Sequence, residues 1–94
     1  MAYSLEFKPS ALKEWEKLDN TVKIEFKKKL EKVLEHPKIE AHRLSGLPNC
    51  YKIKLRTLGY RLVYQVEDER ITVLVLAIGK HEKSKVYETT KSRY

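Results

Sequence analysis

The stretch CYKIKLRTLGYRLVYQV, residues 50–66, decides the fold, because two patterned segments in it flank a short turn. In CYKIKLR, apolar and cationic side chains alternate, which is the period of a strand with one buried and one exposed face. Residues 57–59 end in Gly59 and predict a turn, after which YRLVYQV returns as a second strand. The stretch therefore predicts an antiparallel hairpin with a cationic face.

The segments on either side extend this hairpin to an α+β domain. Residues 71–78, ITVLVLAI, are apolar on both faces of a strand, which predicts a central strand covered on both sides. Upstream, apolar residues recur at helical spacing in residues 9–18 and 22–34, and residues 2–7 are a short strand candidate. The polar tail, residues 82–93, is predicted to be helical. The order β-α-α-β-β-β-α predicts a small antiparallel sheet with two helices on one face.

Length and composition indicate one domain, residues 1–94, without a linker or an internal repeat. The single cysteine, Cys50, excludes an intrachain disulfide and favours a reducing cytoplasm. The start MAYSLEFKPS shows no signal-peptide pattern, and residues 71–78 are far shorter than the roughly 20 apolar residues that cross a bilayer. We therefore expect a cytoplasmic protein that does not enter a membrane.

Charge is unevenly distributed along the chain. The net charge is +7, and residues 49–65 carry four basic residues and no acidic one. Lys52, Lys54 and Arg56 share one face of the first predicted hairpin strand, and Arg61 returns beside them on the second. A one-signed face suits a phosphate backbone. The alternative is an ordinary solvated face, although such a face usually mixes signs because like charges on adjacent strands repel.

Other chemistries find little support in the sequence. The three histidines and Cys50 show no metal-ligand spacing, and there is no phosphate-binding glycine loop or candidate carboxylate pair in the strands. We therefore expect no metal and no cofactor. Cys50 and Trp15 are predicted to be core residues. The same packing role is expected for three tyrosines: Tyr51, Tyr60 and Tyr64.

The segments CYKIKLRTLGYRLVYQV, AIGKHEKSKVY, ALKEWEKL and RLSGLPNCYKIKLR together resemble the RelE toxins of bacterial toxin–antitoxin systems over nearly the whole chain. The resemblance implies a fold like that of microbial ribonucleases and cleavage of messenger RNA in the ribosomal A site. It also implies two partners, the 70S ribosome and a RelB-like antitoxin that neutralises the toxin. We expect the toxin alone to be a monomer and its antitoxin complex to be a hetero-oligomer.

The resemblance also assigns roles to individual residues. Lys52 and Lys54 match the catalytic lysines of the family, Arg61 matches its phosphate-stabilising arginine, and Tyr87 matches its C-terminal tyrosine. His81 stands where the family often has an arginine, and we hypothesise that it is the general acid, since its ordinary pKa of about 6.5 suits proton transfer at neutral pH. The candidate RNA contacts are five cationic side chains: Arg43, Arg56, Lys80, Lys83 and Lys85.

The hypothesised reaction is a metal-independent attack of a ribose 2′-OH on the adjacent phosphate, with Lys54 as the base. Neighbouring positive charges are expected to lower the pKa of Lys54. Three alternatives remain open. The chain could be a non-catalytic gyrase binder like the ParE toxins, which share the architecture but lack the basic catalytic set. It could also bind RNA or the ribosome without turnover, or be a degenerate toxin that retains antitoxin binding.

Overall fold

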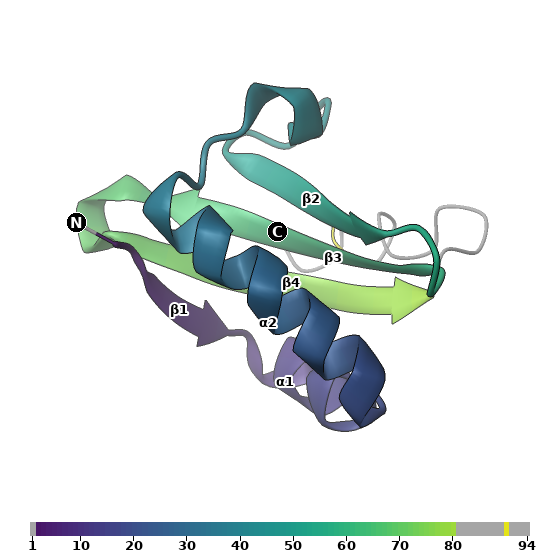
Figure 1. The fold of residues 1–94 in the computed structure, drawn as a ribbon. Helices are drawn as coiled ribbons and strands as arrows, with labels where there is room; N and C mark the ends of the chain where they lie inside the picture. Colours follow the sequence, from purple (N-terminus) through teal and green to yellow (C-terminus); the bar gives the residue numbers. More distant parts are fainter. Residues whose placement is uncertain (1, 81–89, 91–94) are drawn as a thin grey trace.

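The computed structural model describes residues 2–80 and 90, and this part of the chain forms one four-stranded sheet with two helices on one face (Figure 1). The predicted element order is confirmed through the fourth strand. The predicted last helix falls outside the described residues, apart from Thr90, which is helical and buried. The elements are β1 (Ser4–Phe7), α1 (Pro9–Glu16), α2 (Asn20–Glu35), the 3-10 turn η1 (Glu40–His42), β2 (Cys50–Leu55), β3 (Tyr60–Glu67), the 3-10 turn η2 (Asp68–Arg70) and β4 (Thr72–Lys80).

Strands β2, β3 and β4 form the predicted antiparallel meander, in the sheet order β1-β4-β3-β2. Gly59 closes the β2–β3 turn with a φ of 73°, a left-handed conformation that glycine adopts without strain. The predicted wholly antiparallel sheet is wrong at the other edge, where β1 runs parallel to β4, with Ser4 opposite Thr72, so the sheet is mixed. A tight turn cannot join parallel strands, and here the helices and the β2–β3 hairpin form the long crossover between them.

The two helices share one apolar core with the sheet. α2 begins after Asp19, whose carboxylate accepts a hydrogen bond of 3.0 Å from the Val22 amide and so caps the helix. Trp15 of α1 packs between Phe7 and Phe26, with ring centroids 5.4 and 6.3 Å away, which confirms its predicted core position. The buried residues of α2 recur at helical spacing: Val22, Phe26, Leu30 and Val33.

β4 is covered on both faces, as predicted for residues 71–78. Val75 belongs to the core on the helix side, whereas Leu76 belongs to a second apolar cluster on the far face. Cys50 is fully buried in that second cluster, and burial raises the pKa of its thiol to about 11. Because the thiolate is the reactive form, Cys50 is an unreactive packing residue, as predicted.

Beside η2, a set of charged side chains ties distant segments together, and we call it the η2 network. The Asp68 carboxylate accepts a hydrogen bond of 2.9 Å from the Tyr3 hydroxyl and another from the Lys38 ammonium. Arg70 donates to both carboxylate oxygens of Glu6, at 2.8 and 2.9 Å. The η2 network therefore joins residues of the N-terminal segment and the segment after α2 to the β3–β4 turn by hydrogen bonds and ion pairs.

Candidate active site

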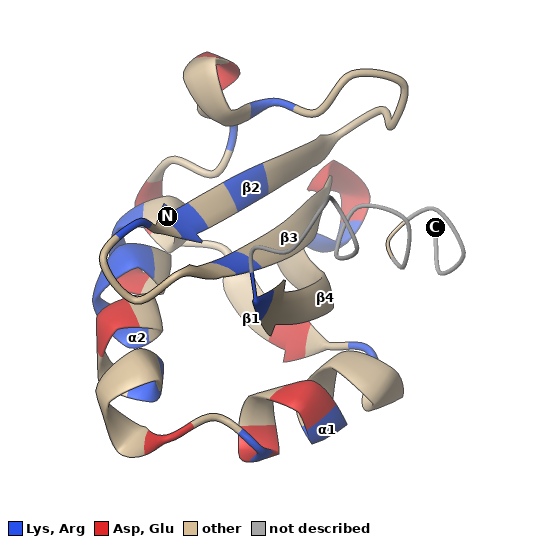
Figure 2. Cartoon of the chain, turned by 90° about the vertical axis from the view of Figure 1, so that its right-hand side faces the viewer, with Lys and Arg blue, Asp and Glu red and all other residues tan. Residues whose placement is uncertain are grey.

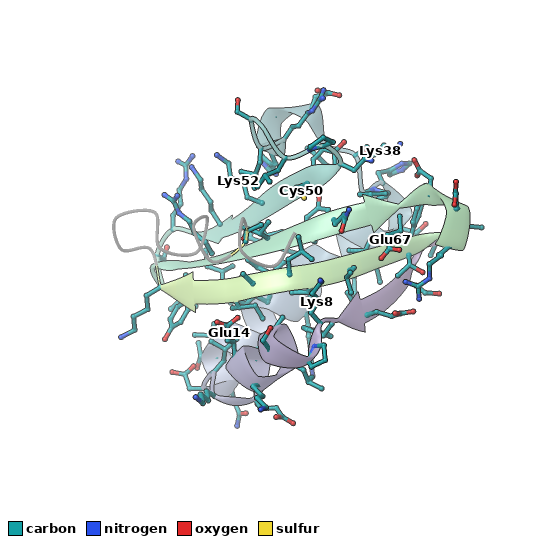
Figure 3. The ribbon with its side chains drawn as sticks, turned by 180° about the vertical axis from the view of Figure 1, so that it is seen from behind. Lys8, Glu14, Lys38, Cys50, Lys52 and Glu67 are labelled. Atoms are coloured by element: carbon teal, nitrogen blue, oxygen red, sulfur yellow. The ribbon has the colours of Figure 1, made fainter. Side chains whose placement is uncertain are left out.

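Cationic side chains of β2 and β3 lie on the sheet face opposite α1 and α2, the face turned to the viewer in Figure 3. On β2, Lys52 and Lys54 are half-buried, while Ile53 points to the opposite face and is buried in the core. The antiparallel register places Lys54 directly opposite Arg61. Side chains in such positions leave Cβ atoms only about 4.5–5.5 Å apart. The predicted alternation is confirmed. We call the resulting surface the cationic face, and it consists of Lys52, Lys54, Arg56 and Arg61.

The lysine at the centre of this face is electrostatically perturbed. The charge of Lys52 lowers the pKa of Lys54 most, the charge of Arg61 lowers it next, and desolvation and Arg56 add to the same shift. Like charges disfavour the protonated amine. At a given pH, a larger fraction of Lys54 is therefore neutral than of an isolated lysine, which favours a role as proton acceptor.

The lysines of the cationic face have no neutralising carboxylate in the described part of the chain. Lys52, Lys54 and Arg56 form no ion pair with a carboxylate there, since the pairs found lie on α2, at η1 and in the η2 network. Like charges on neighbouring strands repel, so Lys52 and Lys54 are held beside Arg61 at an electrostatic cost. Phosphate groups would relieve this repulsion, so the surface is suited to a polyanion.

A hollow of about 300 Å³ opens beside the β2–β3 turn at the end of the cationic face. Lys54, Arg56 and Arg61 line it together with Tyr60. A guanidinium group remains charged and can donate two parallel hydrogen bonds to phosphate oxygens. The hollow therefore combines an amine whose pKa is lowered with two guanidinium groups that can donate hydrogen bonds to phosphate oxygens.

The other predicted RNA contacts are dispersed. Arg43 follows η1, forms an ion pair of 3.8 Å with Glu40, and pairs through its backbone with Tyr51 at the outer edge of β2. Lys80 ends β4 opposite Tyr60, so strand alternation directs it away from the cationic face. Four further predicted residues lie outside the described residues: His81, Lys83, Lys85 and Tyr87.

The tyrosines predicted to pack do so. Tyr51 and Tyr64 are buried on the helix side, and their rings stack with centroids 5.6 Å apart. The Tyr64 hydroxyl donates a hydrogen bond of 2.8 Å to the Pro37 carbonyl, which satisfies its buried polar atom. Tyr60 is half-buried against the same core. These tyrosines support the sheet from behind the cationic face.

Residues 2–80 and 90 contain neither a metal-binding cluster of side chains nor a helix that could span a membrane. No group of three or more His, Cys, Asp or Glu side chains within these residues is arranged to hold a metal ion. None of the helices in the same residues has the length and apolar character needed to cross a membrane.

Sequence reasoning did not assign two residues near the cationic face, Lys29 of α2 and His42 of η1. Both line a groove that Lys52 and Lys54 also line. The sequence does show that Glu25 and Lys29 lie on the same side of α2, because residues four apart share one stripe of a helix. The packing of that stripe beside the edge of β2 is a tertiary feature that no local pattern contains.

A family-model match joins this α+β fold and its cationic sheet face to a class of protein, the toxins of type II toxin–antitoxin systems. The family model described as "ParE toxin of type II toxin-antitoxin system, parDE" matches residues 5–84 of the chain.

Relatives narrow the class further. The chain is 58% identical over 93 residues to the "mRNA interferase toxin RelE" of Escherichia coli strain K12. The matched residues cover 99% of this chain and 98% of that protein. The chain is 48% identical, with the same coverage, to a "Putative RelE-like toxin protein" of Escherichia coli. The chain therefore belongs to the RelE toxin family, as its motifs suggested.

Solved structures agree with this membership. The isolated E. coli RelE toxin superposes with a TM-score of 0.85 at 58% identity, covering 98% of each chain. RelE from the intact E. coli RelBE toxin–antitoxin complex superposes with a TM-score of 0.84 at 60% identity, covering 87% of this chain and 100% of that chain. The predicted α+β fold is confirmed.

Proposed function

We propose that this protein is the toxin of a type II toxin–antitoxin system and an endoribonuclease that cuts messenger RNA in the ribosomal A site. The observation that carries the proposal is the cationic face, where Lys54 lies opposite Arg61 and has a lowered pKa. The printed name of its relatives, mRNA interferase, supports the same activity. A ribosomal site of action places the protein in the cytoplasm.

In the proposed reaction, the ribose 2′-oxygen attacks the adjacent phosphorus, and the bond between phosphorus and the 5′-oxygen breaks. Lys54 accepts the proton of the 2′-OH, and Arg61 stabilises the negative charge that develops on the phosphate oxygens. His81 donates a proton to the leaving 5′-oxygen. The products are a 2′,3′-cyclic phosphate and a 5′-OH. The reaction requires no metal, because the substrate itself supplies the nucleophile.

The remaining candidates have supporting roles in this scheme. Lys52 lowers the pKa of Lys54 and adds positive charge for the phosphate. Tyr87 stacks on a base or orients the attacking hydroxyl. The other cationic residues that hold the RNA backbone are Arg43, Arg56, Lys83 and Lys85. Lys80 is left out of the scheme, because strand alternation directs it away from the cationic face.

The proposed partners follow from the chemistry and from the family. The scheme contains no conventional pair of catalytic acid and base carboxylates, so it depends on the ribosome to position the RNA, and such positioning can supply much of a rate enhancement. A RelB-like antitoxin is the expected neutralising partner, since solved structures contain the E. coli RelE toxin with RelB. We expect the free toxin to be a monomer and the complex to be a hetero-oligomer.

A second candidate function is a ParE-type action on gyrase, and the description of the matching family model favours it. Such a binder has no need for a lysine with a lowered pKa opposite an arginine. The cationic face therefore favours the ribonuclease function. The target would be messenger RNA in the first candidate function and gyrase in the second.

The proposal is tested by adding the purified protein to programmed ribosomes that carry a defined message and mapping the RNA ends. We expect cuts inside the A-site codon that end in a 2′,3′-cyclic phosphate. Lys54→Ala and His81→Ala should each slow single-turnover cleavage by about 10²-fold or more. Lys13→Ala, at an exposed position of α1, is the matched control and should cut at the wild-type rate. An intact message with wild-type protein would overturn the proposal, and a gyrase supercoiling assay would then test the second candidate.

A further inference from the structure

A groove of about 850 Å³ lies between α2 and the outer edge of β2. α2 contributes Lys29, η1 contributes His42, β2 contributes Lys52 and Lys54, and the following turn contributes Arg56. The volume lies within the range of roughly 300–1,000 Å³ that is usual for ligand pockets. The groove shares Lys52, Lys54 and Arg56 with the cationic face and extends from it to Lys29 of α2 and His42 of η1.

The charge of the groove has one dominant sign. Lys29 is exposed and forms no ion pair with a described residue. Glu25 is the one carboxylate among the lining residues, and it is already paired with Lys28 at 3.3 Å. Figure 2 shows basic positions and no acidic one on β2, and basic positions interspersed with acidic ones on α2. The groove is therefore suited to an anionic ligand.

The same groove also has apolar lining residues. Leu55 is buried, Leu58 is half-buried, and Ala41 of η1 completes the apolar part. A nucleotide combines a weakly polar face, on its base and ribose, with a charged phosphate. An apolar lining with cationic side chains around it matches that combination better than it matches a simple anion.

We propose that this groove binds the messenger RNA strand on one side of the cut, with Lys29 and His42 at the phosphates and a nucleotide seated against Leu55 and Leu58. The inference rests on the proposed function. Because Lys52 and Lys54 line the groove and also belong to the cationic face, a single strand can pass without interruption from the hollow beside Arg61, over the edge of β2, to α2.

The test measures binding of a short fluorescent single-stranded RNA with 2′-O-methyl groups, which block the attacking hydroxyl. The variant is Lys29→Ala/His42→Ala, and the matched control is Lys13→Ala/His36→Ala, which removes the same residue types from exposed positions outside the groove. We expect the groove variant to bind about tenfold more weakly. Its salt dependence, the slope of log K against log salt, should become shallower by about 0.7 for each phosphate that the variant no longer neutralises. The control should match the wild type.

Two comparisons separate failure of this inference from failure of the proposed function. On programmed ribosomes, the groove variant should need more toxin for half-maximal cleavage yet reach the wild-type maximal rate. Unchanged RNA affinity and an unchanged salt slope in the groove variant would overturn the inference, even if the wild type cuts normally. The groove variant could instead bind RNA like the wild type but bind polyglutamate more weakly. The groove would then be a protein-docking surface, and the inference would again be overturned. If the wild type does not cut the message, the proposed function fails, whatever the binding result.

Discussion

The η2 end of the sheet and its β2–β3 end shift the pKa of a lysine in opposite directions. In the η2 network, the hydrogen bond to Asp68 raises the pKa of Lys38. On the cationic face, the charge of Lys52 lowers the pKa of Lys54. An opposite charge in contact favours the charged form of a lysine, whereas neighbouring like charges disfavour it. The difference indicates that the η2 end has a structural role and that the β2–β3 end is adapted to a ligand.

The largest expected effect separates the two ends by activity. Arg61→Ala should slow single-turnover cleavage on programmed ribosomes by roughly 10²–10³-fold, because it removes a charge positioned at the developing phosphate charge. Arg70→Ala, which removes an arginine from the η2 network, is the matched control and should cut at the wild-type rate. A near wild-type rate for Arg61→Ala would show that Arg61 does not stabilise the transition state.

A smaller effect is expected from removing the charge that perturbs Lys54. Cleavage should rise with pH through the pKa of Lys54, because only the neutral amine accepts a proton. Lys52→Gln removes the largest cause of the lowered pKa, so the rising limb of the pH–rate profile should move to higher pH. Lys28→Gln, an exposed change on α2, should leave the limb in place. A profile that is flat across the neutral range in both proteins would contradict Lys54 as the base.

The smallest effect is expected at the η2 network. Asp68→Asn should lower the melting temperature only slightly, because exposed ion pairs contribute little, and cleavage should be unchanged. The hydrogen bonds from Lys38 and Tyr3 lower the pKa of Asp68. The stability that they add is present above the ordinary pKa of about 3.9 and is lost as pH falls through the lowered pKa. The two proteins should therefore melt alike at low pH. A loss of cleavage in Asp68→Asn would remove the functional distinction between the two ends.

Much of the fold and the centre of the site could be predicted from residues 50–66. Strict alternation assigns Lys52 and Lys54 to one face, and a short turn containing Gly59 brings Arg61 back beside them. These features are local, because a strand period of two and a tight turn are both encoded over a few residues. The like-charge effect on Lys54 followed from the same placement.

The remaining features depend on long-range packing and could not be predicted in the same way. The parallel pairing of β1 with β4 joins residues that are 68 positions apart, such as Ser4 and Thr72. The contact of Tyr3 with Asp68 spans 65 positions. Lys29 lines the same groove as Lys52 and Lys54 only because α2 packs across the sheet. No local periodicity specifies any of these arrangements, since each depends on how complete elements dock.

The sheet order β1-β4-β3-β2 has a consequence for the time at which the protein becomes able to act during its own synthesis. β4 is the last strand of the sheet to be made, yet it lies at the centre and pairs with both β1 and β3. Until it emerges, β1 has no partner strand and the β2–β3 hairpin stands alone, and isolated hairpins are at best marginally stable in water. A growing chain therefore cannot hold Lys54 opposite Arg61 on a stable sheet until β4 has emerged from the ribosome, so the cationic face forms only after residues 72–80 have been made.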